Sequence, residues 1–144
     1  MPDLKLDAAQ TIVTAALRAA RERNFKPMAV AVYDARGALR GFASEDGTSL
    51  RRAEIAMGKA YGALALGVPS RTIGKMAGER PHFIAAVSHV VGGPVIPVPG
   101  GVLIRDEAGG LLGSVGISGD TSDNDEAAAV SGVEAAGLKA ETGA

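Results

Sequence analysis

Residues 109–125, GGLLGSVGISGDTSDND, carry the clearest structural pattern in the chain. A Gly-Gly turn opens the stretch, and the β-favouring run 111–117 follows it. The run ends at Ser118-Gly119, where an acidic, hydroxyl-rich segment leads into a helix of small residues. A buried strand that delivers flexible backbone and several carboxylates to one point is a place where a ligand is expected.

The acidic segment after the strand has two interpretations. Four carboxylates fall within eight residues, and they belong to Asp120, Asp123, Asp125 and Glu126. They could offer oxygen ligands to a hard cation or form a polar rim for a small ligand, but their spacing is not that of an EF-hand loop. Alternatively, acids in the first turn of a helix complement its dipole, and residues 122–125 match a capping box. We favour the second interpretation, so no metal site is predicted.

The rest of the chain alternates between hairpins and helices. Apolar periodicity, turn residues and caps predict each element. The expected helices are 7–23, 50–66, a short one at 70–77 and 127–140, and the expected hairpins pair 28–33 with 38–44 and 102–105 with 111–118. Residues 82–89 fit either a short helix or a strand. Successive hairpins favour an antiparallel sheet with helices on its faces, an α+β or three-layer fold, in one domain spanning 1–144.

Composition and net charge narrow the classes of function that the protein could have. A formal charge of −1 gives no electrostatic reason to bind nucleic acid or an anionic membrane, and no run of residues is apolar enough to span a bilayer. The chain has no cysteine, and its N-terminus lacks the apolar core of a signal peptide, so we expect a cytoplasmic protein. With 20 glycines and 3% aromatic residues, the core is built from small side chains, which favours further burial in a homo-oligomer.

Two pairs of titratable residues are candidates for chemistry. Glu54 and Lys59 lie on an otherwise apolar helix, where charge is costly unless it is paired or functional. An ion pair within or between subunits explains them equally well. His82 and His89 are the only histidines; each is a candidate metal or haem ligand or general base, although their spacing matches no two-histidine metal motif and an exposed histidine is the commoner case.

An ordered set of short motifs resembles the GlcG/HbpS-like haem-binding (haem-degrading) family, which also forms the C-terminal domain of PduO-type proteins. The motifs are residues 29–34 (AVAVYD) with Gly37, Asp46-Gly47, residues 55–61 (IAMGKAY), Pro81, residues 92–96 (GGPVI), residues 99–101 (PGG), residues 113–119 (GSVGISG) and Asp125-Glu126. The resemblance implies a three-layer, profilin-like domain with a five-stranded antiparallel sheet. It also implies assembly into dimers and higher oligomers such as octamers, and haem as a possible cofactor.

Three hypotheses about function follow. In the first, an oligomeric protein binds a small molecule, with haem suggested by the resemblance, between its subunits. Lys59 would hold a carboxylate or propionate in a site lined by Asp46, Glu54, Lys59, Gly92, Gly93, Ser118, Gly119, Asp120 and Asp125. In the second, an enzyme acts on a small hydroxy- or oxo-acid, with Lys59 and either Glu54 or Asp125 as acid and base. In the third, the protein is a non-catalytic accessory protein whose charged residues make only subunit contacts.

Overall fold

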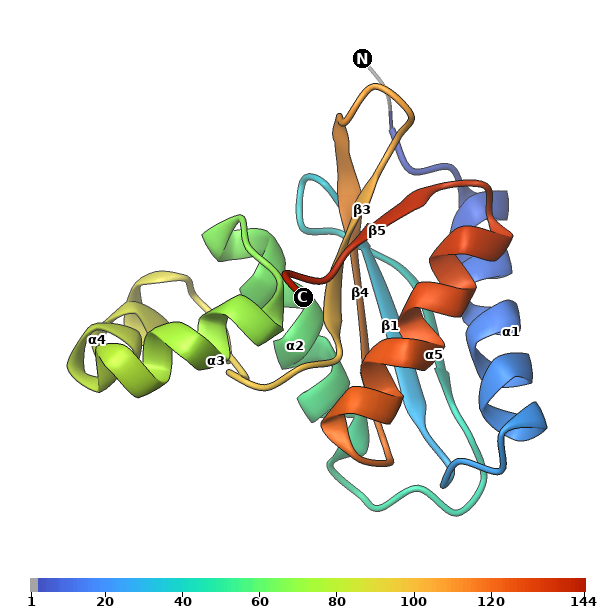
Figure 1. Ribbon diagram of the computed structural model, residues 1–144, viewed down its shortest axis with the longest axis horizontal. Coiled ribbons are helices and arrows are strands. Elements are labelled where there is room, and N and C mark those ends of the chain that lie inside the picture. The colour runs from blue at the N-terminus through green and yellow to red at the C-terminus, as the bar shows by residue number, and fades with distance from the viewer. Residues whose placement is uncertain (1–2) are drawn as a thin grey trace.

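The computed structural model describes residues 3–144, which form a five-stranded antiparallel sheet between two layers of helices (Figure 1). The order is α1 (Leu6–Glu22), β1 (Ala29–Asp34), β2 (Leu39–Ser44), α2 (Arg52–Leu66), α3 (Ser70–Glu79), α4 (Pro81–Val90), β3 (Gly101–Arg105), β4 (Leu111–Ser118), α5 (Ser122–Ala135) and β5 (Lys139–Glu141). The strands lie in the order β2-β1-β4-β3-β5. The predicted fold class is therefore confirmed.

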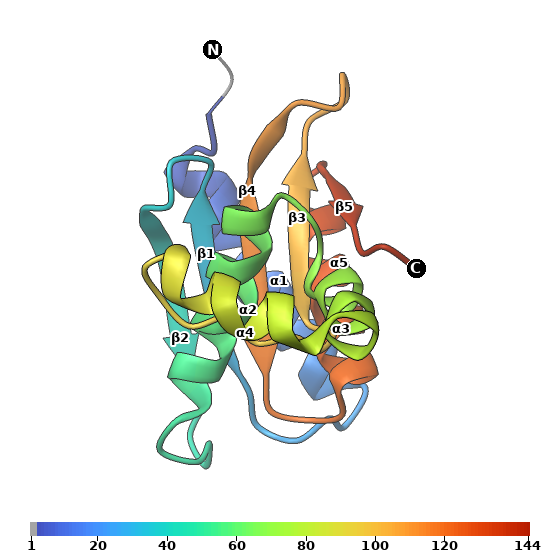
Figure 2. The ribbon, with the colours of Figure 1, turned by 90° about the vertical axis from the view of Figure 1, so that its left-hand side faces the viewer.

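The two faces of the sheet are covered differently. Helices α1 and α5 lie side by side on one face, while α2 lies on the other and α3 and α4 extend beyond it (Figures 1 and 2). The α1/α5 side holds the larger core, with Ile12, Val30 and Ile117 fully buried among other branched side chains. On the α2 side a smaller core cluster consists of Ala29, Ala31 and Ala56.

Glycines in the sheet let α2 lie directly on the strands. A Cβ at Gly116 in β4 would overlap the carbonyl oxygen of Ala56, and one at Gly101 in β3 would overlap that of Lys59. Both oxygens belong to the backbone of α2, so neither can rotate away to admit a side chain at these positions. The high glycine content thus sets the distance between α2 and the sheet.

The stretch 82–89, for which the sequence allowed either a helix or a strand, is helical, within α4. The last helix differs from the prediction, and it begins at Ser122 instead of residue 127. The last helix ends at Ala135 instead of residue 140, because Gly137 turns the chain at φ +76° and residues 139–141 then pair with β3 as β5. Thr121, rather than Ser122, caps α5 by accepting from the amide of Asn124.

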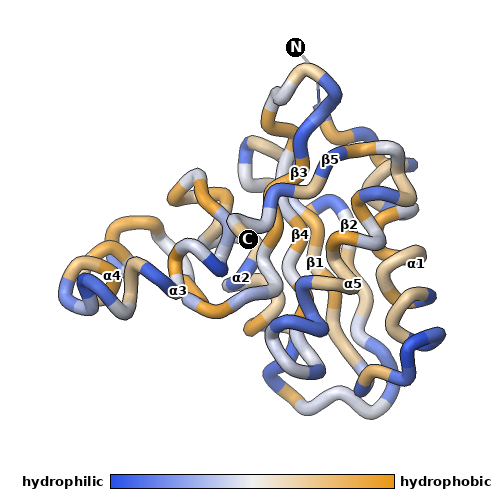
Figure 3. Tube along the Cα trace, in the orientation of Figure 1, coloured by the Kyte–Doolittle hydropathy of each residue, from blue (hydrophilic) through white to orange (hydrophobic). Residues whose placement is uncertain are grey.

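Helix α4 is apolar but largely uncovered. The tube in Figure 3 shows hydrophobic residues along this helix although it lies far from the sheet. Only Ile84 of its ten residues is buried, and Val90 is 80% exposed. No helix within residues 3–144 is long and apolar enough to cross a membrane.

Candidate functional site

A buried ion pair joins α2 to the first turn of α5, at the end of β4. The Lys59 Nζ atom lies 3.1 Å from Asp125 Oδ2 and donates a second hydrogen bond, of 2.9 Å, to the carbonyl oxygen of Ile117. Asp125 Oδ1 accepts from the amide of Asp120 at 2.9 Å. Lys59 is 2% exposed and Asp125 is 1% exposed, so both charges are compensated inside the protein.

The backbone around this pair is shaped to fit the lysine. Gly100 has φ +128°, and a Cβ there would lie 2.8 Å from Lys59 Nζ and 2.7 Å from the Ile117 carbonyl oxygen. A Cβ at Gly119 would likewise overlap the backbone of Pro27 and Met28. These glycines therefore have a packing role: they admit the ammonium group and the turn that leads to Asp120.

Burial dominates the electrostatics of the pair. Loss of water lowers the pKa of Lys59, and the neighbouring Arg52 guanidinium lowers it further, while Asp125 opposes both effects. Burial likewise raises the pKa of Asp125, against the attraction of Lys59. Arg52 donates from Nη1 to Ser118 Oγ at 3.0 Å and covers this end of the strand. The ammonium group does not face solvent and has no free path to an external carboxylate.

The other acids of this segment stabilise its turn. Asp120 accepts from the amides of Lys26 and Thr121, each at 2.7 Å, and from Asn124 Nδ2 at 2.8 Å. These hydrogen bonds lower the pKa of Asp120 to about 2. Asp123 and Glu126 both accept from Arg71 in α3. Within residues 3–144, no three His, Cys, Asp or Glu side chains are grouped so that they could hold a metal ion.

A separate hollow of about 410 Å³ lies on the other side of α2, beside β1. Its walls are mainly aromatic and apolar and are formed by Tyr33, Gly37, Glu54, Met57, Tyr61, Gly92, Gly93 and Pro94. The two tyrosine rings are tilted by 60° with their centroids 6.2 Å apart. Tyr61 donates its hydroxyl proton to the Val91 carbonyl, which ties the loop after α4 to α2.

The glycine loop and the phenols shape this hollow. A Cβ at Gly93 would lie 3.0 Å from the Tyr61 ring, so the bare backbone lies flat against that ring. Burial and the neighbouring Tyr61 raise the pKa of Tyr33, which therefore remains a neutral phenol near pH 7. The hollow can accept a flat apolar group and offer it phenol and thioether side chains.

The predicted site residues thus fall into separate places. Glu54, Gly92 and Gly93 line the tyrosine hollow, whereas Lys59, Ser118, Gly119, Asp120 and Asp125 lie around the buried ion pair. Five residues along a helix correspond to about 140° of rotation, which separates Glu54 from Lys59. Glu54 instead pairs with Arg51 at 2.7 Å, and its side chain is 50% exposed.

The remaining candidates lie elsewhere on the surface. Asp46 lines a third hollow with Arg21, Pro27, Ser44 and Glu45. His82 and His89 are exposed on α4, and their separation of seven residues places them on one side of that helix, two turns apart. Neither histidine lines the tyrosine hollow.

Sequence reasoning missed five residues of the hollow, of which Tyr33, Met57 and Tyr61 supply its side-chain chemistry and Gly37 and Pro94 complete its walls. A signal for Met57 and Tyr61 was present, because Glu54, Met57 and Tyr61 recur at three- and four-residue spacing on α2. The chain contains only two tyrosines, and both line this hollow.

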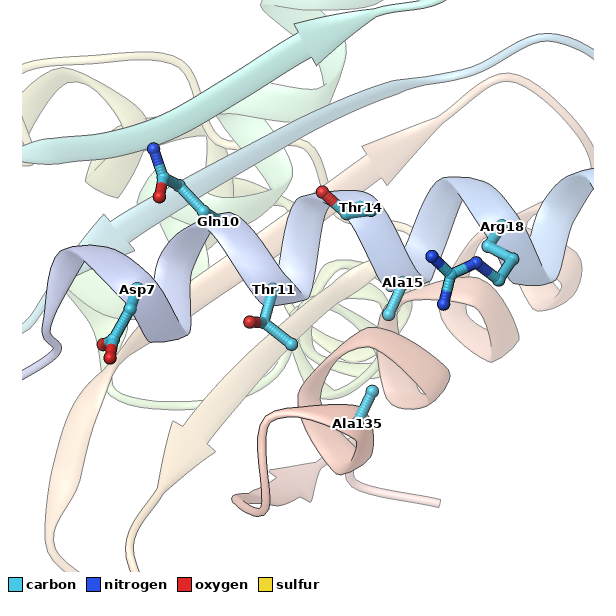
Figure 4. Close-up of a pocket in the computed structure, with 7 residues that line it drawn as sticks. All are labelled: Asp7, Gln10, Thr11, Thr14, Ala15, Arg18 and Ala135. Carbon is cyan, nitrogen blue, oxygen red and sulfur yellow. The ribbon is translucent and has the colours of Figure 1, made fainter.

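A larger hollow of about 480 Å³ lies over α1, but its chemistry is different (Figure 4). Threonine, glutamine and charged side chains line it: Asp7, Gln10, Thr11, Thr14 and Arg18, with Ala15 and Ala135. It lies along the solvent-facing side of one helix and brings together neither aromatic rings nor buried polar groups. Substitutions in this hollow are therefore suitable controls for substitutions in the tyrosine hollow.

Comparisons with known proteins agree on one family. The model of the family described as haem degrading protein HbpS-like matches residues 4–134. Among solved structures, HbpS is 25% identical and has a TM-score of 0.80, with 93% of this chain and 90% of that chain covered. The complex of PduOC with haem is 22% identical with a TM-score of 0.85, covering 98% of this chain and 100% of that one.

A third structure, the Klebsiella pneumoniae protein ORFY, is 22% identical with a TM-score of 0.83, covering 95% of this chain and 93% of that one. At this identity, the second and third structures show a shared fold. No curated protein sequence matches the chain significantly.

Proposed function

Because the chain belongs to the HbpS-like haem-degrading family, we propose that it binds haem in the tyrosine hollow between β1, α2 and the loop after α4. The observation that carries this proposal is the composition of the hollow's walls. Two tyrosine rings, a thioether, a proline and bare glycine backbone meet around about 410 Å³. Ligand sites are commonly concave, mostly apolar and within this range of volume.

The residues present fit a haem group. The flat macrocycle would lie against the Tyr33 and Tyr61 rings, and the Gly92-Gly93 backbone leaves space beside them. Met57 and Tyr33 carry atoms that ligate haem iron in other proteins. When bound, haem would supply an iron centre for redox or ligand chemistry, and this chain's residues would orient the macrocycle and exclude water from one of its faces.

His82 and His89 remain candidate iron ligands. Helix α4, which carries both, leads through Val91 into the Gly92-Gly93 wall of the hollow. An exposed histidine on this helix is accessible to a haem group that extends out of the open hollow, either in the same chain or in a second copy.

We further propose that the protein is a homo-oligomer, between a dimer and an octamer, that holds the ligand between subunits. The support is the exposed apolar side chains on elements next to the hollow: Phe83 and Val90 on α4, which precedes its glycine wall, and Leu39 and Phe42 on β2, which pairs with β1. Exposed apolar patches beside a cleft are typical of subunit interfaces. A cytoplasmic location stays a prediction from the cysteine-free composition.

Titration of the purified protein with haemin, followed through the Soret band, tests the proposal. We expect a saturable, protein-induced Soret shift. Met57→Trp, which fills the hollow, should abolish it, whereas Thr14→Trp, which fills the hollow over α1, should leave it unchanged. A shift that survives Met57→Trp, or no shift with the wild-type protein, contradicts haem binding at this site. His89→Ala and Tyr33→Phe then identify the iron ligand through the position of the band.

The geometry gives less support to the enzyme hypothesis. Lys59 and Glu54 lie on different sides of α2, and the Lys59–Asp125 pair is covered. Turnover of a small hydroxy- or oxo-acid that is lost on Lys59→Met without loss of folding would revive acid–base catalysis by this pair.

A further inference from the structure

The tyrosine hollow shares two of its walls with a second hollow. That second hollow, of about 190 Å³, is lined by Ala35, Arg36, Gly37, Tyr61, Leu64 and Ala65. Gly37 and Tyr61 are walls of both hollows. Together they form one groove, called here the α2 groove, beside helix residues Glu54, Met57, Tyr61 and Leu64. At 1.5 Å per residue, these ten steps span about 15 Å, comparable with the breadth of a tetrapyrrole.

The two ends of the α2 groove differ in charge, because the acid at one end is already paired with Arg51. Arg36 lines one end and Glu54 lines the other. The Arg36 side chain is 77% exposed and reaches Asp34 Oδ2 at 3.2 Å through one guanidinium nitrogen. Asp34 is fully buried and also accepts from Arg40 and from the amides of Arg36 and Ala38.

This arrangement leaves Arg36 able to bind a second anion. The carboxylate of Asp34 is shared among several donors, and the guanidinium of Arg36 retains donors that no other side chain of the described chain engages. Arginine is well suited to bind a carboxylate through two parallel hydrogen bonds. At the opposite end Glu54 is already paired with Arg51 at 2.7 Å, so no unpaired cation is available there to a carboxylate of the ligand.

On the basis of the proposed function, we infer that the α2 groove orients its ligand. It selects a flat apolar molecule that carries its carboxylates along one edge. Those carboxylates lie at Arg36, and the apolar edge lies toward Met57 and Glu54. Asp34 acts as a positioning residue, because it holds Arg36 at the end of the groove.

Haemin and haemin dimethyl ester distinguish this orientation from haem binding alone. The two ligands share the macrocycle and the iron, but the ester lacks the negative charges. We expect Arg36→Gln to weaken haemin binding about tenfold, as for loss of one charge-assisted hydrogen bond, and to leave the affinity for the ester unchanged. Arg36→Lys should recover part of the loss.

Arg18→Gln is the matched control, because Arg18 lies in the hollow over α1. This variant should bind both ligands with wild-type affinity. Equal haemin affinity in Arg36→Gln and the wild-type protein would overturn the orientation while leaving haem binding intact. Absence of haemin binding by the wild-type protein would overturn both proposals. Far-ultraviolet circular dichroism confirms that each variant is folded before it is titrated.

Discussion

Among single side chains, Lys59 and Asp125 have the largest predicted effect on stability. Their burial costs solvation free energy, and the direct ion pair, the Ile117 carbonyl and the Asp120 amide offset that cost. A charge left unpaired at this place would keep only its hydrogen bonds to the backbone. We therefore assign the Lys59–Asp125 pair a role in stability ahead of a role in catalysis.

Removal of one partner tests that role. Lys59→Met leaves the Asp125 carboxylate buried without its cation, and we expect a loss of about 3–5 kcal/mol in the free energy of unfolding, measured with urea. The double variant Lys59→Met with Asp125→Leu removes both charges and should lose much less. If the single and double variants are equally unstable, the ion pair is not the source of the effect.

Asp120 gives a prediction about pH. Its pKa in the folded protein is about 2, below the ordinary 3.8, so the unfolded chain binds more protons between these values. The stabilisation by Asp120 is thus complete above about pH 4 and is lost as the pH falls toward 2. Asp120→Asn should have a shallower decline in stability across this window, measured by thermal unfolding. The exposed Glu107→Gln is the control, and a slope in Asp120→Asn equal to that of the wild type contradicts the assignment.

For the acidic segment after β4, the sequence predicted the local role in helix capping but not the tertiary contacts. Helix capping and dipole effects are local, so residues 122–125 were recognisable as a helix start, one residue after the actual cap, Thr121. That Asp125 would turn toward Lys59, 66 residues away, depends on tertiary packing. For the same reason Glu54 and Lys59 were placed in one site, although only Lys59 points into the core.

At the level of secondary structure, the closeness of α2 and the sheet explains the glycine-rich strands. Gly116→Ala should lower the free energy of unfolding by about 3 kcal/mol, because its Cβ would meet the backbone of Ala56 and Ala60. Gly78→Ala is the matched control: this glycine is exposed in α3, nothing lies within 4 Å of its Cβ, and alanine favours the helix. We expect Gly78→Ala to add up to about 1 kcal/mol. Similar stabilities for the two variants in urea unfolding would contradict this account of the packing.

Most elements were predictable because their signals are local. The hairpins have Gly-containing turns at 34–37 and 106–110, and α1 has a regular apolar face. Strand β5 was missed because three residues, Lys139–Glu141, carry too short a pattern to be distinguished from a continuing helix. Its pairing with β3 is a property of the assembled sheet.

For the whole molecule, the uncovered face of α4 predicts self-association. Val90→Glu places a charge on the exposed apolar side of this helix and should shift the protein toward monomers, measured by light scattering after size exclusion. Leu50→Glu is a control, because Leu50 is equally exposed but lies before α2. A wild-type monomer, or an unchanged mass in Val90→Glu, would argue against α4 as the interface.

The candidate site could be predicted only in part. Gly92 and Gly93 were identified from their motif, but the tyrosine hollow combines β1, α2 and the loop after α4, which only the fold brings together. Lys59 lies on a different side of α2 from this hollow, which is why we propose Arg36 rather than Lys59 as the partner of a ligand carboxylate.

The central claim, that a tetrapyrrole binds against Tyr33 and Tyr61, has a direct test in the nuclear magnetic resonance signals of the tyrosine rings. Because these are the only two tyrosines, their ring signals report on the hollow alone. On titration with diamagnetic zinc protoporphyrin, we predict that both sets of ring signals shift together, in step with porphyrin binding measured by absorbance. Porphyrin that binds while both sets of ring signals stay unmoved would contradict the account.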